Sequence, residues 1–394
     1  MNPNIFHKEV QDFINDQVEK GTDINKIILS GSPFNDISIQ ELAQQIQGKI
    51  IAKKKFTYLY KTDSIYYPPK LNLEQTSSQT TAEYKSTLVT GKKLIDITGG
   101  LGIDSYFFSK NFENIIHCEI NSELSIIAKH NFTKLNAENI STQLEDGLKV
   151  LERTNDLDWI YIDPSRRNEV KGKVFFLKDC IPNVPEHLST LFLKADNIII
   201  KTSPLLDIKA GLEELSNVCE VHIVAVNNEV KELLWILKKN FDGQLQLRTV
   251  NITSTKNEIY SFSPSDEQTT FAEYGLPEKY LYEPNAAIMK SGGFMSIGRD
   301  YNLNKLHQHS HLYTNTKLID FPGRVFKIQS VIPYHKKTIQ KLNISKANIT
   351  TRNFPDPVFV LRKKLKIRDG GNDYLFFTTN RDNQRIVIHC VKPE

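Results

Sequence analysis

Between Leu94 and Ser263 the sequence alternates short apolar runs with longer segments of helical periodicity. The runs are LIDI (94–97), IIHCEI (115–120), ISTQLE (140–145), WIYI (159–162), IIIK (198–201) and VHIVAV (221–226). The segments between them, such as 122–135 and 229–239, repeat apolar residues at helical spacing. Strands that alternate with helices are joined by crossovers, which produce a parallel sheet covered by helices on both faces. The alternation therefore predicts an α/β domain.

Two further runs follow, QLQLRTVNI (244–252) and NEIYSFS (257–263), and both alternate apolar with polar residues. Only a short connection separates them, which suits an antiparallel pair and excludes a helical crossover. We therefore expect this pair at one edge of the sheet. Together the runs predict an α/β fold with a Rossmann-like sheet of seven strands whose last strand is antiparallel.

The regions on either side of this alternation differ from it, and a chain of 394 residues is expected to hold two or three domains. Before it, Phe6, Val10 and Phe13 repeat at helical spacing, as in short amphipathic helices. After about residue 282, short apolar runs with basic neighbours indicate a small α+β domain. We expect a helical N-terminal domain, the α/β domain and a basic C-terminal domain at 1–75, 76–280 and 281–394.

The net charge of +4 conceals an uneven distribution. From Arg324 to Arg368 there are 12 Lys or Arg residues and one acid, Asp356, a local balance of +11. The rest of the chain must then carry −7. An imbalance of this size favours a polyanionic partner such as nucleic acid, although a basic face that is merely solvated is the alternative.

The sequence also bounds the location of the protein. No apolar stretch approaches the roughly 20 residues needed to cross a bilayer, and the start lacks the pattern of a secretory signal. Four cysteines occur without paired spacing, which argues against a disulfide framework or a zinc ribbon. We therefore expect a cytoplasmic protein that does not contact membranes, while its oligomeric state stays open.

The first predicted strand ends in a glycine-rich turn, DITGGLG (96–102). Ligands of open α/β sheets bind at the carboxyl ends of strands, and glycines let the backbone approach them closely. Glu119 ends the second strand, where an acid can accept hydrogen bonds from ribose hydroxyls, and Asp146 closes the third, where adenine would lie. The candidate cofactor-binding residues are Asp96, Thr98, Gly99, Gly100, Gly102, Glu119, Asp146 and Gly147.

These acids favour S-adenosylmethionine as the cofactor. Asp96 can balance the cationic amino group of its methionine part, which a pyrophosphate site would not favour. An NAD-dependent dehydrogenase is the alternative, because an acid after the second strand is common to both. However, the third glycine position of the dinucleotide pattern holds Ser105.

The fourth strand leads into Asp163-Pro164-Ser165-Arg166-Arg167. In methyltransferases that act on exocyclic base amines, an Asp or Asn here holds the amine in line with the transferable methyl group. Asp163 and Pro164 fit that pattern, whereas Arg166 replaces an aromatic residue and could stack on a base or clamp a phosphate. Covalent chemistry at pyrimidine C5 is excluded, because Ser203 stands where a cysteine nucleophile would be needed. Asp163, Pro164 and Arg166 are the catalytic candidates.

The chain resembles the bacterial class I methyltransferases with a C-terminal THUMP-like domain. The resemblance rests on SSQTTAEYKS (77–86), DITGGLGIDS (96–105), YIDPSRR (161–167), IKTSPLLDI (200–208) and VAVNNEVKELLW (224–235). It continues through YEPNAAIMKSG (282–292), HLYT (311–314), DFPGRVFKI (320–328) and RKKLKIRDGGNDYLF (362–376), and so spans most of the chain. It implies S-adenosylmethionine as cofactor, Asp163 beside the transferable methyl group, and RNA as a partner of the C-terminal domain.

The sequence thus predicts a methyltransferase that acts on a base in rRNA or tRNA. Two alternatives stay open: an enzyme for a small molecule or protein, and an RNA-binding module with a vestigial methyltransferase fold. The candidate RNA-binding residues are Arg167, Lys336, Lys337, Arg362, Lys363, Lys364 and Lys366. His307, His309 and His311 could hold a metal, but methyl transfer requires none, and a polar connection explains them equally well.

Overall fold

The computed structural model describes residues 1–166 and 176–393, except for the side chain of Arg166. The chain divides into two compact units. The first comprises Met1–Cys219 with Leu233–Asp242, and the second Glu220–Glu232 with Gly243–Glu394. Arg167, a candidate RNA-binding residue, lies outside the described residues.

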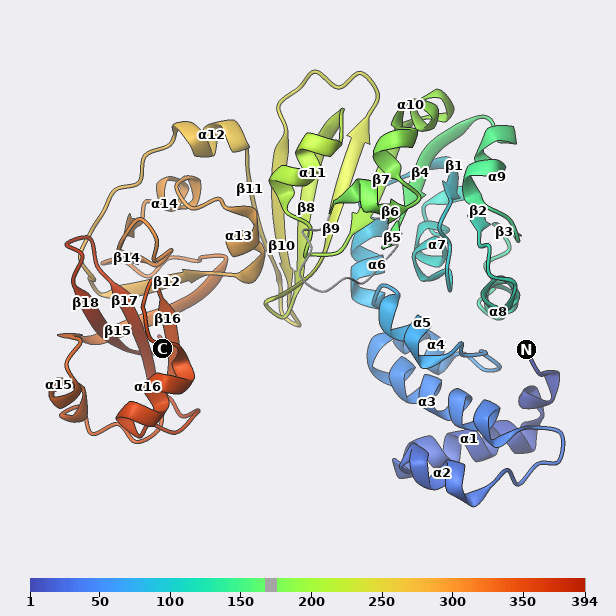
Figure 1. Ribbon diagram of the computed structural model, residues 1–394, viewed down its shortest axis with the longest axis horizontal. Helices are drawn as coiled ribbons and strands as arrows, with labels where there is room; N and C mark the ends of the chain where they lie inside the picture. Colours follow the sequence, from blue (N-terminus) through green and yellow to red (C-terminus); the bar gives the residue numbers. More distant parts are fainter. Residues whose placement is uncertain (167–175, 394) are drawn as a thin grey trace. The chain divides into compact units, whose positions relative to one another are not determined.

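The first unit begins with a bundle of helices, drawn in blue in Figure 1. These are η1 (Pro3–Phe6), α1 (Lys8–Lys20), α2 (Ile24–Ser30), α3 (Ile39–Lys55), α4 (Thr57–Lys61), α5 (Lys70–Gln75) and α6 (Gln79–Ser86). Their apolar faces share one core, in which Val10, Leu42 and Phe56 are buried. A capping box at Ser38 and Glu41 starts α3 by satisfying backbone N–H groups of its first turn. The predicted helical N-terminal region is therefore confirmed.

The rest of the first unit is an α/β sheet. Its strands are β1 (Gly91–Asp96), β2 (Phe112–Cys118), β3 (Ile140–Gln143), β4 (Leu157–Ile162), β7 (Ala195–Thr202) and, from Leu233 onward, β9 (Glu229–Lys238). The helices between them are α7 (Ile103–Phe108), α8 (Ser122–Lys134), α9 (Gly147–Arg153), α10 (Val184–Lys194) and α11 (Ile208–Glu214). The first five strands pair in parallel, so their carboxyl ends lie along one edge of the sheet, while β9 pairs antiparallel to β7. The predicted α/β domain is confirmed.

One predicted helix is wrong. Residues 229–239 were expected to be helical, but Glu229–Lys238 forms β9. Leu233 to Leu237 are all buried, as in a central strand with both faces covered, and such a strand shows no polar alternation. Its apolar residues happen to fit helical spacing as well, which explains the error.

The strand count differs from expectation, and β9 adds an antiparallel strand inside the sheet. Among the described residues the large sheet has nine strands, in the order β11-β10-β8-β9-β7-β4-β1-β2-β3, instead of seven. In the second unit, β8 (Val218–Val226) pairs in parallel with β10 (Gln246–Ile252). The predicted pair of β10 with β11 (Asn257–Phe262) is antiparallel and ends the sheet, as expected.

The second unit continues into a C-terminal α+β region, drawn in orange to red in Figure 1. Its sheet has the order β13-β14-β12-β15-β18-β17-β16. The strands are β12 (Tyr280–Pro284), β13 (Asn304–Lys305), β14 (Tyr313–Asn315), β15 (Gly323–Pro333), β16 (Asn348–Arg352), β17 (Tyr374–Thr379) and β18 (Arg385–Val391). The helices are α12 (Pro264–Thr269), α13 (Ala286–Ser291), α14 (Ser296–Asp300), α15 (Lys336–Gln340) and α16 (Val358–Leu365). The predicted small α+β region is confirmed.

Strands β5 (Ser165–Arg166) and β6 (Cys180–Ile181) form a short antiparallel ladder just after β4.

Among the residues that the structure describes, no helix combines the length and apolar character needed to span a bilayer.

Candidate active site

The turn after β1 is organised around the carboxylate of Asp96. Thr98 N donates to Asp96 Oδ1 at 3.0 Å, and Ser105 Oγ donates to Oδ2 at 2.6 Å. Ser105 Oγ also lies 3.1 Å from Nδ1 of the buried His117. Burial raises the pKa of Asp96 to about 7, although the hydrogen bonds from Ser105 and Thr98 oppose the shift. The carboxylate is therefore poised to change charge near neutral pH.

Two glycines of the predicted site are required by close packing. A Cβ on Gly99 would lie 2.1 Å from Cε1 of the His117 ring. A Cβ on Gly147 would lie 2.2 Å from the backbone oxygen of Ile97. Gly100, by contrast, has a φ of +55°, and a Cβ there would meet only Thr98 O at 4.0 Å. A side chain would therefore clash at Gly99 or Gly147, whereas at Gly100 it would point into open space.

Gly102 closes the turn. Its N–H donates to Gly99 O at 2.9 Å, and its φ of +80° is the left-handed conformation that glycine adopts most easily. It is the N-cap residue of α7. A Cβ at this position would lie 2.2 Å from Phe132.

Glu119 lies directly against the turn. Its Oε2 accepts from Gly100 N at 2.8 Å, and its Oε1 accepts from Asn121 N at 2.7 Å. Asp146 is exposed and is the N-cap of α9, accepting from Leu148 N at 2.8 Å. Capping of α9 is sufficient to explain the hydrogen bond of Asp146. Glu119 differs, because it follows β2 and contacts the glycine turn that follows β1.

Asp163 joins the same edge of the sheet from β4. Its backbone N–H donates to Thr98 Oγ1 at 2.7 Å, which ties the end of β4 to the turn after β1. Its side chain is 33% exposed, and its Oδ2 lies 2.5 Å from Nζ of Lys201, at the end of β7. Pro164 is buried, and the backbone of Arg166 pairs with Cys180. The Asp163–Lys201 ion pair was not predicted from the sequence.

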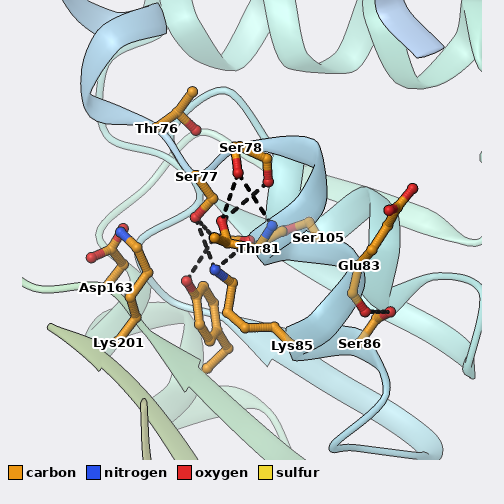
Figure 2. Close-up of polar contacts among 12 residues, drawn as sticks. Thr76, Ser77, Ser78, Thr81, Glu83, Lys85, Ser86, Ser105, Asp163 and Lys201 are labelled. Carbon is orange, nitrogen blue, oxygen red and sulfur yellow. Dashed lines mark hydrogen bonds and ion pairs between the residues drawn. The ribbon is translucent and has the colours of Figure 1, made fainter. Parts of the chain in front are cut away.

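A second unpredicted feature is a buried polar network beside Asp163 and Lys201, shown in Figure 2. Lys85 in α6 is fully buried, and its Nζ lies 3.2 Å from Asp104 Oδ1 and 3.0 Å from Ser77 Oγ. Asp104 Oδ2 accepts from Ser77 Oγ at 2.8 Å and from Tyr161 Oη at 2.7 Å. The network therefore connects α6, α7 and β4, two residues before Asp163.

The candidate RNA-binding residues lie in the C-terminal region. Lys336 and Lys337 belong to α15, and Lys363 and Lys364 to α16. The buried residues of both helices contribute to one core. The exposed candidates include Lys336, Lys337, Lys363, Lys364 and Lys366.

Two of the basic candidates are engaged within the domain. The guanidinium of Arg362 forms an ion pair with Asp369 and donates to Ala347 O. Lys364 donates to Tyr334 Oη at 2.9 Å. Because these contacts satisfy part of their hydrogen-bonding capacity, Arg362 and Lys364 are weaker candidates for phosphate contacts.

The three histidines do not converge on a common point. His307 contacts Asn383 and Asn353, and the His311 ring stacks on Phe294 with ring centroids 3.6 Å apart. Within residues 1–166 and 176–393, no three His, Cys, Asp or Glu side chains gather as a metal site requires.

Comparison with known proteins relates the chain to one family. A ferredoxin-like domain model matches residues 280–322, and a THUMP domain-like model matches residues 323–392. No curated protein matches. A solved structure described as a "putative methyltransferase" from Porphyromonas gingivalis W83 is 30% identical and superposes with a TM-score of 0.88. That match covers 98% of this chain and 99% of the other.

Weaker likenesses exist to an rRNA methylase from Streptococcus thermophilus and to a Streptococcus mutans protein crystallised with SAH. Both are 14% identical and have a TM-score of 0.30 over 41% of this chain, covering 94% and 96% of theirs. The Porphyromonas gingivalis match is much stronger, because the two structures superpose over nearly their whole lengths. The chain therefore belongs to the family of that protein, the class I methyltransferases with a C-terminal THUMP-like domain.

Proposed function

We propose that this protein is an S-adenosylmethionine-dependent methyltransferase that acts on rRNA or tRNA. The observation that carries the proposal is the convergence of three strand ends on one turn. Gly100 N lies 2.8 Å from Glu119 Oε2, and Thr98 Oγ1 lies 2.7 Å from Asp163 N. The glycine turn, Glu119 and Asp163 thus lie at one edge of the sheet, which supports a nucleoside cofactor site beside a methyl acceptor.

The residues present fit S-adenosylmethionine. Gly100 leaves open space beside Glu119, as a nucleoside that donates ribose hydroxyls would need. Asp96 can supply the negative charge that the amino group of the methionine part requires, and Asp146 is exposed at the next strand end. When bound, the cofactor supplies a methyl group activated on a cationic sulfur.

The chain's own residues would then position the acceptor. Asp163 accepts a hydrogen bond from the nucleophilic group and orients it, and Pro164 and Thr98 fix the backbone that carries Asp163. In the sequence Arg166 and Arg167 follow Asp163 closely, and a guanidinium group can bind phosphate or stack on a base. The expected acceptor from the sequence is a base.

The catalytic part of the proposal is tested by Asp163→Ala. We expect this variant to bind S-adenosylmethionine with unchanged affinity in calorimetry and to lose methyl transfer to RNA from cells that lack the protein. Full activity would remove Asp163 from the mechanism. Failure of the wild-type protein to bind S-adenosylmethionine at millimolar concentration would favour the vestigial module over an enzyme.

The RNA part is tested by the salt dependence of binding. Replacing Lys336 and Lys337 by Ala removes two exposed charges from α15. If both contact phosphates of single-stranded RNA, the slope of log K against log salt concentration should fall by about 1.4. The matched control replaces the exposed Lys8 and Lys26 of the N-terminal bundle and should leave the slope unchanged. Equal slopes for all three proteins would contradict an RNA contact at α15.

A further inference from the structure

A lysine lies beside Asp163 because of the register of two strands. β7 pairs with β4 in parallel, with Ile200 opposite Ile162, so Lys201 and Asp163 are level at the carboxyl edge. Lys201 Nζ is 2.5 Å from Asp163 Oδ2, and its side chain is 13% exposed. Figure 2 shows the two side chains together, at the side of the buried network. An ammonium group is therefore held where the methyl acceptor is expected.

The charge of Lys201 discriminates between acceptors. An amine gains positive charge as its nitrogen bonds to the methyl carbon, and a neighbouring ammonium group disfavours that transition state. A hydroxyl group gives up its proton as it reacts, and the same ammonium group stabilises the negative charge that develops on its oxygen.

We infer that the acceptor is a hydroxyl group, the ribose 2′-hydroxyl of an RNA nucleotide. This inference rests on the proposed function and revises the acceptor expected from the sequence. The 2′-hydroxyl is the hydroxyl group that each internal RNA nucleotide presents, and it is absent from DNA. Asp163 selects it by accepting its proton, and Lys201 is a positioning residue that holds the carboxylate and offsets the charge on oxygen.

The proposed step transfers the methyl group from sulfur to the hydroxyl oxygen. The bond between the acceptor oxygen and the methyl carbon forms while the bond between that carbon and the donor sulfur breaks. The electron pair of the broken bond stays on sulfur, which becomes neutral. The hydroxyl proton passes to the carboxylate of Asp163 and then to solvent, so no oxidant or further reactant is needed.

The first experiment locates the methyl group. Full-length protein is incubated with RNA from cells that lack it and with S-adenosylmethionine carrying a radioactive methyl group, and the RNA is hydrolysed in alkali. Alkaline cleavage uses the 2′-hydroxyl as nucleophile, so a 2′-O-methylated nucleotide remains in a dinucleotide. We expect the label in dinucleotides. Label in mononucleotides would overturn the ribose assignment but leave RNA methylation intact, and no label in any RNA would overturn both.

The second experiment tests Lys201. We expect Lys201→Met to lower the single-turnover rate about 100-fold, as for loss of one group that stabilises a developing oxyanion, with unchanged affinity for S-adenosylmethionine. Lys201→Arg should recover part of the rate. Lys209→Met, at an exposed site on α11, is the matched control. A Lys201→Met rate within threefold of the control would refute the role.

Discussion

Replacing Lys85 by Met isolates the contribution of its buried ion pair with Asp104. Met fills a similar volume but leaves the Asp104 carboxylate buried without its nearest cation, while Ser77 and Tyr161 still donate to it. Breaking a buried pair by removing one partner typically costs about 3–5 kcal/mol. Because the two hydroxyl donors remain, we expect a loss of unfolding free energy near about 3 kcal/mol, at the lower end of that range.

Urea denaturation followed by tryptophan fluorescence measures this loss. Trp159 lies in β4 and Trp235 in β9, and both belong to the first unit, so their signal reports the part that contains the pair. With a typical urea slope of about 2–3 kcal/mol per molar, the midpoint should fall by about 1 M. The control Lys92→Met, at an exposed position of β1, should change the unfolding free energy by less than about 0.5 kcal/mol.

The pH dependence provides the sharper test. Burial raises the pKa of Asp104, but Lys85, Lys201 and the hydrogen bonds from Tyr161 and Ser77 outweigh it, and the pKa lies below its ordinary value. A lowered pKa stabilises the fold above the unfolded value of about 4, and this stability is lost as the pH falls through the folded pKa.

Without Lys85 the pKa of Asp104 rises. The variant therefore loses most unfolding free energy at neutral pH, and the difference in unfolding free energy from wild type should become smaller in acid. A double variant with Asp104→Asn carries no buried charge and should regain at least about 1 kcal/mol. A difference in unfolding free energy that stays constant from pH 7 to pH 4, or a double variant less stable than Lys85→Met, would exclude the uncompensated Asp104 carboxylate as the cause of the loss.

Two further predictions concern the glycine turn. Gly147→Ala places a Cβ 2.2 Å from Ile97 O, so the backbone must move. We expect the unfolding free energy in urea to fall by about 1–3 kcal/mol and S-adenosylmethionine to bind more weakly. Wild-type values of both would show that the packing at Gly147 does not require glycine. Because burial raises the pKa of Asp96 to about 7, a cofactor that needs the ionised carboxylate should bind about tenfold more weakly at pH 6 than at pH 8 in calorimetry. Ser105→Ala removes a donor that favours ionisation and should move this transition to higher pH; identical profiles for the two proteins would exclude the coupling.

Much of the α/β region could be predicted because its information is local. Each of these side chains directly ends or follows an apolar run, so the positions of Asp96, Glu119 and Asp163 at strand ends could be predicted from the runs alone. Ser105 shows the limit of this approach. In the sequence it is only a missing glycine, but the structure shows that its hydroxyl group holds Asp96 and contacts His117. The turn of α7 brings these three groups together, and no spacing rule for glycines expresses that contact.

The Asp163–Lys201 pair escapes the sequence for a different reason. The two residues are 38 positions apart, and they meet only because the crossover from β4 to β7 returns in a register that places Ile200 opposite Ile162. A shift of that register by one residue would turn Lys201 to the other face of the sheet. The apolar run IIIK predicts the strand but not its register, and the Asp163–Lys201 pair depends on that register. The proposed hydroxyl acceptor therefore rests on strand pairing, a property that residue patterns within one strand do not contain.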